Sequence, residues 1–106
     1  MDRSLALSRI GGDDDLLREI AGLFLQEYPG LLARLAAAVS ENDAQTVERA
    51  AHSIKGSVAN FGAQSAFEAA LALEQMGRAE KLVDAHAQLS ALELALASLH
   101  AELEAL

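Results

Sequence analysis

The chain has 106 residues, a formal net charge of −8 at pH 7 and no cysteine. This length predicts a single domain over residues 1–106 that buries a hydrophobic core without covalent cross-links. The missing cysteines exclude disulfide bonds and thiolate metal sites. The acidic charge argues against nucleic acid as a partner, because surfaces that bind phosphate backbones are normally basic.

The chain shows neither a membrane segment nor an enzyme signature. No apolar run is long enough to cross a bilayer, and the N-terminus lacks a signal-peptide pattern. We therefore expect a cytoplasmic protein without membrane insertion. Gly-rich phosphate loops and serine-nucleophile elbows are also missing. Aromatic residues make up only 4% of the chain, while Ala and Leu abound, so the composition favours helices over strands.

The sequence of the N-terminal part predicts a short segment followed by one long helical region. Residues 1–12 are expected to form a short helical or irregular segment that ends at a Gly-Gly break. Asp13–Asp15 offers an N-cap and acidic residues that suit the positive end of a helix dipole. The helical pattern then continues to about Val39, and Pro29 is expected to kink this helix or split it in two.

Two further helices are predicted in the middle of the chain. The turn at Ser40–Asp43 offers the N-cap of a central helix that runs from about 44 to 60. Gly62 follows this helix at a position typical of a C-terminal glycine. Ser65–Glu68 matches a capping box and predicts the start of the next helix, which should end at Gly77.

The last helix carries the most regular apolar pattern in the chain. It is expected to start near Glu80, and its apolar residues alternate steps of three and four through Leu82, Ala85, Leu89, Leu92, Leu96, Leu99, Leu103 and Leu106. Such a seam is typical of helices that pack along their length. Together with the short connections, it predicts an all-α fold: an antiparallel up-and-down four-helix bundle with a short N-terminal extension.

The central helix has one face that predicts burial and another that predicts exposure. Its apolar stripe steps by four, three, four and three residues through Val47, Ala51, Ile54, Val58 and Phe61. At about 100° per residue, His52 lies roughly 140° from the middle of that stripe. We therefore expect the imidazole of His52 to face solvent.

The exposed face around His52 combines basic side chains with a position that has no side chain. Arg49 and Lys55 lie one turn away in opposite directions, and Gly56 lies four residues after the histidine. A glycine inside a helix costs about 1 kcal/mol relative to alanine, which suggests that another molecule approaches closely here. Imidazole is a nucleophile near neutral pH, and cations can stabilise a phosphoryl group on it. Spacing alone does not distinguish this chemistry from a merely solvated histidine.

A longer motif resembles the signature of histidine-containing phosphotransfer (HPt) domains. It reads His52-x-Ile54-Lys55-Gly56-Ser57-x-x-x-Phe61-Gly62. Upstream, Phe24–Pro29 is similar to the preceding helix of the family. Downstream, Leu73-Glu74 and Gly77-Arg78 are similar to the following helix. Recognisable matches cover roughly residues 13–78.

The resemblance implies a bundle whose exposed histidine exchanges a phosphoryl group with an aspartate of a response-regulator receiver domain. His52 would then be the phosphorylated residue, with Lys55 stabilising the phosphoryl group and Gly56 giving the receiver access. Glu74 falls where family members often place a Glu or Gln that bonds to the imidazole. Arg78 falls where some members carry a basic residue near the site.

The same resemblance sets expectations for the partners. We expect receiver domains to bind an apolar patch beside the histidine to which Ala59, Phe67 and Leu71 contribute, with Arg49 and Arg78 adding positive charge. A hybrid sensor histidine kinase is a further expected partner. No metal or cofactor is expected in this chain, and Mg²⁺ should belong to the receiver's acidic pocket. We expect a monomer without ATP-dependent kinase activity of its own.

Other interpretations remain open. Ala50–Gly56 also resembles the phosphorylated domain of chemotaxis histidine kinases, which receives phosphate from an ATP-binding domain of the same protein. A helical adaptor that binds receivers without accepting phosphate is another alternative. A metal site in a bundle would need inward carboxylates and a Glu-x-x-His pair, whereas Glu48 lies four residues before His52. His86 and His100 lie off the leucine seam and are expected to be solvated.

Overall fold

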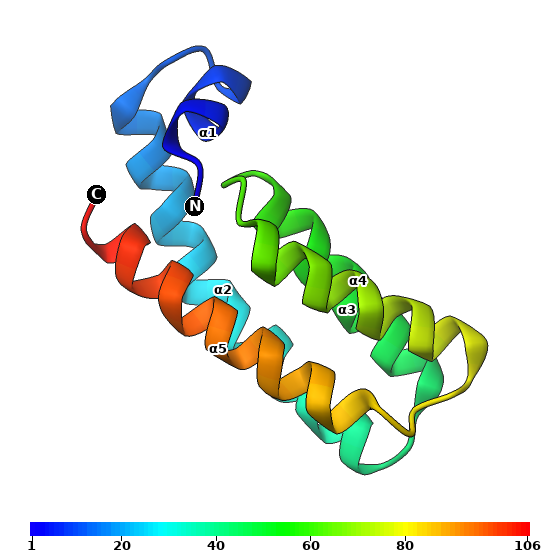
Figure 1. Cartoon of the computed structure of the whole chain (residues 1–106). Coiled ribbons are helices and arrows are strands. Elements are labelled where there is room, and N and C mark those ends of the chain that lie inside the picture. The colour runs from blue at the N-terminus through cyan, green and yellow to red at the C-terminus, as the bar shows by residue number, and fades with distance from the viewer.

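The computed structural model describes all 106 residues and contains five helices and no strand (Figure 1). The helices are α1 (Arg3–Arg9), α2 (Asp14–Ser40), α3 (Ala44–Ala59), α4 (Gln64–Ala79) and α5 (Ala85–Glu104). The all-α prediction is confirmed.

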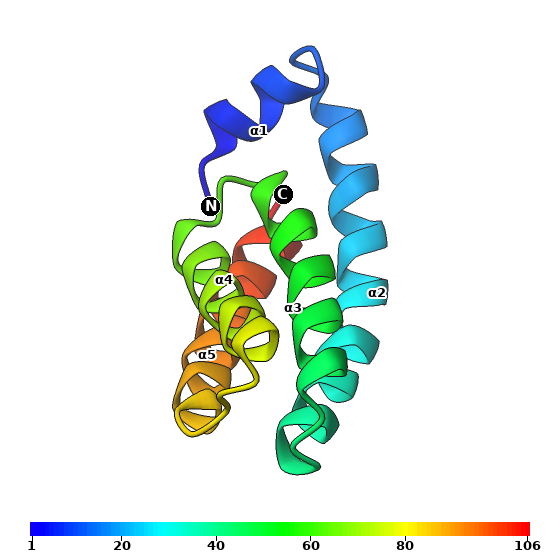
Figure 2. The same cartoon turned by 90° about the vertical axis from the view of Figure 1, so that its right-hand side faces the viewer.

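The four long helices pack as a closed ring. Helix α2 contacts α3 and α5, and α4 contacts the same two helices from the other side. Consecutive long helices run in alternating directions, and the short helix α1 lies across one end (Figures 1 and 2). The backbone amide of Asp2 donates to the carbonyl of Phe61 (2.9 Å), which ties the N-terminal segment to the end of α3. No helix is both long enough and apolar enough to span a membrane.

Helix α2 continues through Pro29 without a break. Of the two outcomes expected for this proline, a kink or a split into two helices, the split is therefore excluded. Proline removes one backbone donor and tends to bend a helix. Here Pro29 lies on the exposed side of α2, so its ring takes no place in the core. The buried residues on both sides of the proline, such as Phe24 and Leu35, hold the two halves against the same core.

Aspartate side chains cap the first turns of three helices, and two of these caps are the ones that the sequence predicts. Asp2 accepts a hydrogen bond from the amide of Leu5 at the start of α1. The side chain of Asp13 accepts hydrogen bonds from the amides of Asp15 and Leu16 at the start of α2. Asp43 accepts from the amide of Thr46 at the start of α3. These bonds satisfy backbone donors that have no partner within the helix. The beginning of α3, which carries His52, is therefore fixed by its own sequence.

Three predicted helix boundaries are wrong. The N-cap of α4 is Ala63, without a side-chain bond, so Ser65 lies inside the helix and forms no capping box. Helix α4 passes Gly77 and ends at Ala79, because Glu80 adopts the left-handed conformation (φ 57°) that terminates it. Helix α5 begins at Ala85 instead of near Glu80. The apolar pattern extends into the turn before it because Leu82 packs on the core without being helical.

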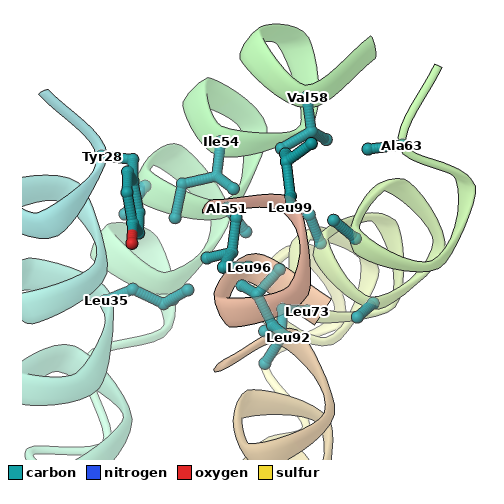
Figure 3. Close-up of a cluster of buried hydrophobic side chains, with 14 of the residues drawn as sticks. Tyr28, Leu35, Ala51, Ile54, Val58, Ala63, Leu73, Leu92, Leu96 and Leu99 are labelled. Atoms are coloured by element: carbon teal, nitrogen blue, oxygen red, sulfur yellow. The ribbon is translucent and has the colours of Figure 1, made fainter. Parts of the chain in front are cut away.

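A single hydrophobic core lies inside the ring of helices (Figure 3). The predicted stripe of the central helix, Val47, Ala51, Ile54, Val58 and Phe61, is at most 1% exposed. Opposite it lie Leu92, Leu96 and Leu99 of α5, which belong to the leucine seam (Figure 3). The predicted buried faces of α3 and α5 are both confirmed.

His100 is not the solvated residue that the sequence suggests. It is half-buried, with its Nδ1 atom 2.6 Å from the hydroxyl of Tyr28 and its Nε2 atom 3.0 Å from a carboxylate oxygen of Glu104. Burial raises the pKa of Tyr28, and the negative charge of Glu104 adds to this effect. The histidine thus joins α2 to α5, while His86 is exposed as expected.

Two leucines on α5 test how much of the stability comes from this core. Leu96 is 1% exposed and Leu94 is 75% exposed. We expect Leu96→Ala to lower the free energy of unfolding by about 2–5 kcal/mol, because it removes buried contacts and leaves a cavity. Leu94→Ala should change it by no more than about 0.5 kcal/mol. Urea unfolding followed by circular dichroism measures both, and equal effects would contradict the assignment of the core face.

Candidate functional site

His52 lies in the middle of α3 with 66% of its side chain exposed. Its exposure follows from the periodicity of the helix, since the neighbouring Ala51 is completely buried. The core fixes the helix from behind, and the imidazole projects from the opposite surface. The ring is therefore held on a rigid element while one edge remains accessible to another molecule.

A buried glutamate on the adjacent helix contacts both His52 and Lys55. Glu74 of α4 is only 3% exposed and is the single charged residue in the buried set. One carboxylate oxygen lies 2.5 Å from Nδ1 of His52, and the other accepts from Nζ of Lys55 at 2.6 Å. The structure thus brings together His52, Lys55 and Glu74, which are three of the site residues predicted from the sequence.

The charge of Glu74 is stabilised by its two partners. Burial by itself raises the pKa of a carboxyl group, but hydrogen bonds from Lys55 and His52 outweigh this effect and leave the pKa of Glu74 below its ordinary value. Their charges act in the same direction. Glu74 is therefore an ionised group in the interior, paired on both oxygens.

The ionised glutamate fixes the proton of the imidazole. A carboxylate can only accept hydrogen bonds, so the neutral ring must carry its hydrogen on Nδ1 and donate it to Glu74. The lone pair then resides on Nε2, the other nitrogen of the largely exposed His52 ring. This arrangement presents a nucleophilic nitrogen at the surface and holds a countercharge behind the ring.

A second set of charges lies along the same α3–α4 boundary. The guanidinium of Arg78 donates to Glu48 at 2.9 Å and lies 3.6 Å from the oxygen of Glu74 that bonds to His52. The bond to Glu48 and the charges of both glutamates raise the pKa of Arg78. A shallow depression beside the ring has no hydrophobic lining and is formed by Glu48, Arg49, His52, Ser53, Glu74 and Arg78.

The surface beyond Lys55 and Gly56 is open and becomes apolar. A Cβ atom placed on Gly56 would meet no atom within 4 Å. Further along α3, Ala59 lines a groove together with Phe67 of α4 and Leu5 of α1. The structure thus places two of the three predicted apolar contact residues in one groove. The third residue, Leu71, is half-buried and lies one turn along α4 from Phe67. It does not line the groove.

Two features of this region were not predicted from the sequence. One is a groove between α2 and α3, lined by ten residues that include Leu23, which is 53% exposed. The other is the role of Glu48 as the partner of Arg78. A charge-pattern argument could not find this pair, because the two residues lie on different helices and are 30 positions apart. No group of three or more His, Cys, Asp or Glu side chains could hold a metal ion.

Comparisons with known proteins agree on one family. The family model of the Hpt domain matches residues 19–105. Among solved structures, the chain is similar to histidine-containing phosphotransfer protein B (HptB) from Pseudomonas aeruginosa PAO1, with a TM-score of 0.90 and 26% identity, over 98% of this chain and 90% of that chain. A comparison with curated proteins finds no significant match. The matched residues include both helices that form the site around His52.

The lowered pKa of Glu74 predicts a pH dependence of stability. A carboxyl group whose pKa is lower in the folded state stabilises the fold above the unfolded pKa of about 4.3, and this stabilisation is lost as the pH falls through the folded pKa. Between about pH 6 and about pH 3, the wild-type chain should therefore lose more stability than Glu74→Gln. Urea unfolding at several pH values measures this difference. The same loss in both proteins would show that Glu74 is not the charged group inferred here.

Proposed function

The chain belongs to the Hpt domain family, and we propose that it is a phosphorelay intermediate that receives a phosphoryl group on His52 from the aspartyl phosphate of a receiver domain and passes it to a receiver. One observation carries this proposal. The Nδ1 atom of the accessible His52 ring lies 2.5 Å from a carboxylate oxygen of the buried Glu74. The hydrogen of the neutral ring therefore belongs on Nδ1, which leaves Nε2 as the free nucleophile. The similarity to HptB, a histidine-containing phosphotransfer protein, supports the same chemistry.

The transfer step requires no proton to leave the ring. The lone pair of Nε2 attacks phosphorus, the bond from phosphorus to the aspartate oxygen breaks, and the receiver's aspartate departs as a carboxylate. The product is an N-phosphorylated imidazolium whose remaining hydrogen stays on Nδ1, beside Glu74. The carboxylate stabilises the positive charge that develops on His52, and the reverse reaction regenerates the neutral ring.

Lys55 can stabilise the phosphoryl oxygens without leaving its place. An ammonium group has three hydrogen-bond donors, and one of them is used by Glu74. The side chain is 21% exposed, so the remaining donors can serve an incoming phosphoryl group. Phosphoryl transfer depends mainly on positioning and charge stabilisation. The resting ion pair therefore also pre-positions the cation.

We propose that the receiver docks over Gly56 and the groove that contains Ala59 and Phe67, with Leu71 at its margin. Gly56 leaves open space on the helix face beside the reactive ring. Arg49 and Arg78 provide positive charge near the histidine, although the whole chain is acidic, which suits the acidic pocket of a receiver. Any Mg²⁺ would be held by that pocket, and the reaction would take place in the cytoplasm, where receivers reside.

Incubation with a receiver labelled on its aspartyl phosphate tests the proposed function. The wild-type chain should acquire acid-labile, alkali-stable label, which is the behaviour of phosphohistidine, and His52→Gln should acquire none. His86→Gln is the matched control, because it removes an exposed histidine on α5, outside the site. Autoradiography of the separated proteins measures the label. A folded His52→Gln variant that is labelled like the wild type would overturn the assignment of the phosphorylated residue.

Replacement of Gly56 tests the docking surface separately from the chemistry. We expect Gly56→Gln to weaken binding of the receiver about tenfold or more, which corresponds to about 1.4 kcal/mol, because the new side chain occupies the approach to the ring. The helix itself should be as stable as before or more so, since glycine disfavours helices. Calorimetric titration with the receiver measures the affinity.

The matched control for this variant is Gly30→Gln. Gly30 is an exposed glycine inside α2, where an added Cβ also meets no atom within 4 Å. It should leave the affinity for the receiver unchanged. Unchanged binding by Gly56→Gln would place the docking surface elsewhere, and the groove between α2 and α3 would then be the next surface to test.

A further inference from the structure

Gly77 lies at the closest approach of α4 to α3. A Cβ atom added to this residue would lie 2.6 Å from the amide nitrogen of Glu48, 2.7 Å from the carbonyl oxygen of Ala44 and 2.9 Å from the Cα atom of Glu48. All three are backbone atoms of the first turns of α3, so no side chain can rotate away to make room. Gly77 is buried and has an ordinary helical conformation. Glycine is therefore required here because the backbones of α3 and α4 touch. It is not required for an unusual backbone conformation.

The contact at Gly77 lies beside the site on both helices. On α4, Glu74 and Arg78 are three residues before and one residue after the glycine, and Glu74 shares its helix face. On α3, Glu48 lies one turn before His52. Three side-chain bonds cross this boundary near the contact: His52 with Glu74, Lys55 with Glu74, and Glu48 with Arg78.

We propose that Gly77 is a positioning residue for the phosphotransfer reaction, because its missing side chain sets the distance between α3 and α4 at which Glu74 can reach the Nδ1 atom of His52. This inference rests on the proposed function. Ordinary van der Waals contact begins at 3.4 Å, so an added methyl group at 2.6 Å requires the two backbones to move apart. A helix is rigid over one turn, so Glu74 moves with Gly77.

The hydrogen bond to His52 cannot absorb such a movement. It is 2.5 Å long now, and hydrogen bonds weaken rapidly as the donor–acceptor distance exceeds about 3.2 Å. Glu74 is nearly completely buried and its second oxygen is held by Lys55, so the side chain has little freedom to compensate. Loss of this bond would free the imidazole to carry its hydrogen on either nitrogen and to rotate.

The test compares Gly77→Ala with Gly22→Ala. Gly22 is also inside a helix, but a Cβ atom there meets nothing within 4 Å, and the residue lies in α2. We expect Gly77→Ala to slow phosphoryl transfer from a labelled receiver by about 10- to 100-fold, the effect of a displacement of about 1 Å at a reacting group. Gly22→Ala should transfer at the wild-type rate.

A spectroscopic measurement separates positioning from stability. Nitrogen-15 NMR of the His52 ring reports which nitrogen carries the hydrogen, and it needs no receiver. The wild type and Gly22→Ala should show the form protonated on Nδ1, and folded Gly77→Ala should show a mixture of both forms. A variant that is only less stable would keep the wild-type spectrum in its folded fraction. Wild-type tautomer and wild-type rate in folded Gly77→Ala would overturn the inference.

A second variant keeps the test decisive if Gly77→Ala does not fold. Glu74→Asp leaves the helix contact intact but withdraws the carboxylate by one methylene, so it should produce the same mixed spectrum and a similarly slow transfer. A wild-type spectrum and rate in Glu74→Asp would show that the reach of this carboxylate does not matter, which refutes a positioning role for Gly77. Absence of label on the wild type would refute the proposed function instead, while the spectra would still decide whether Gly77 positions Glu74.

Discussion

The structure depends on a buried carboxylate that is shared between two side chains of the neighbouring helix. A charge in the interior is costly unless it is paired and hydrogen-bonded, and Glu74 satisfies this condition only where both His52 and Lys55 are within reach. Sliding of α4 along α3 would break both of these bonds and leave the buried charge with only Arg78, which lies 3.6 Å away on its own helix. The pair of contacts therefore fixes the register of the two helices and the orientation of the imidazole at the same time.

The core and the site are two faces of the same helix. Helix α3 buries Ile54 and Val58 completely, while His52, two residues before Ile54, projects into solvent. Packing on one side restricts the backbone, and the ion pair on the other restricts the ring. A nucleophile can be both exposed and well oriented only with such support, because an exposed side chain alone samples several rotamers.

The sequence predicts the features that depend on one helix at a time. Periodicity alone places Ile54 inside and His52 outside, and the aspartate caps follow from local bonding. The resemblance to a family predicts that Glu74 bonds to the imidazole. Its burial and its bond to Lys55 are seen only in the structure. Ser65 and Gly77 were misread as helix ends because their residue types are common there. Ser65 is an exposed residue inside α4, and Gly77 serves a close approach of the α3 and α4 backbones, which no pattern within α4 reveals.

The balance of charge at the site explains how an acidic protein can receive an anionic group. At rest, Lys55 and Arg78 are each held by a glutamate, and Arg49 lies exposed nearby. These bonds keep the cations in place at the surface and limit repulsion among them. In the proposed reaction, a phosphoryl group on Nε2 would add negative charge near the same cations. It would compete with Glu48 for the exposed Arg78 more easily than with the buried Glu74 for Lys55. The buried pair of Glu74 and Lys55 would thus keep its geometry through the proposed reaction, while the exposed pair of Glu48 and Arg78 would be free to rearrange.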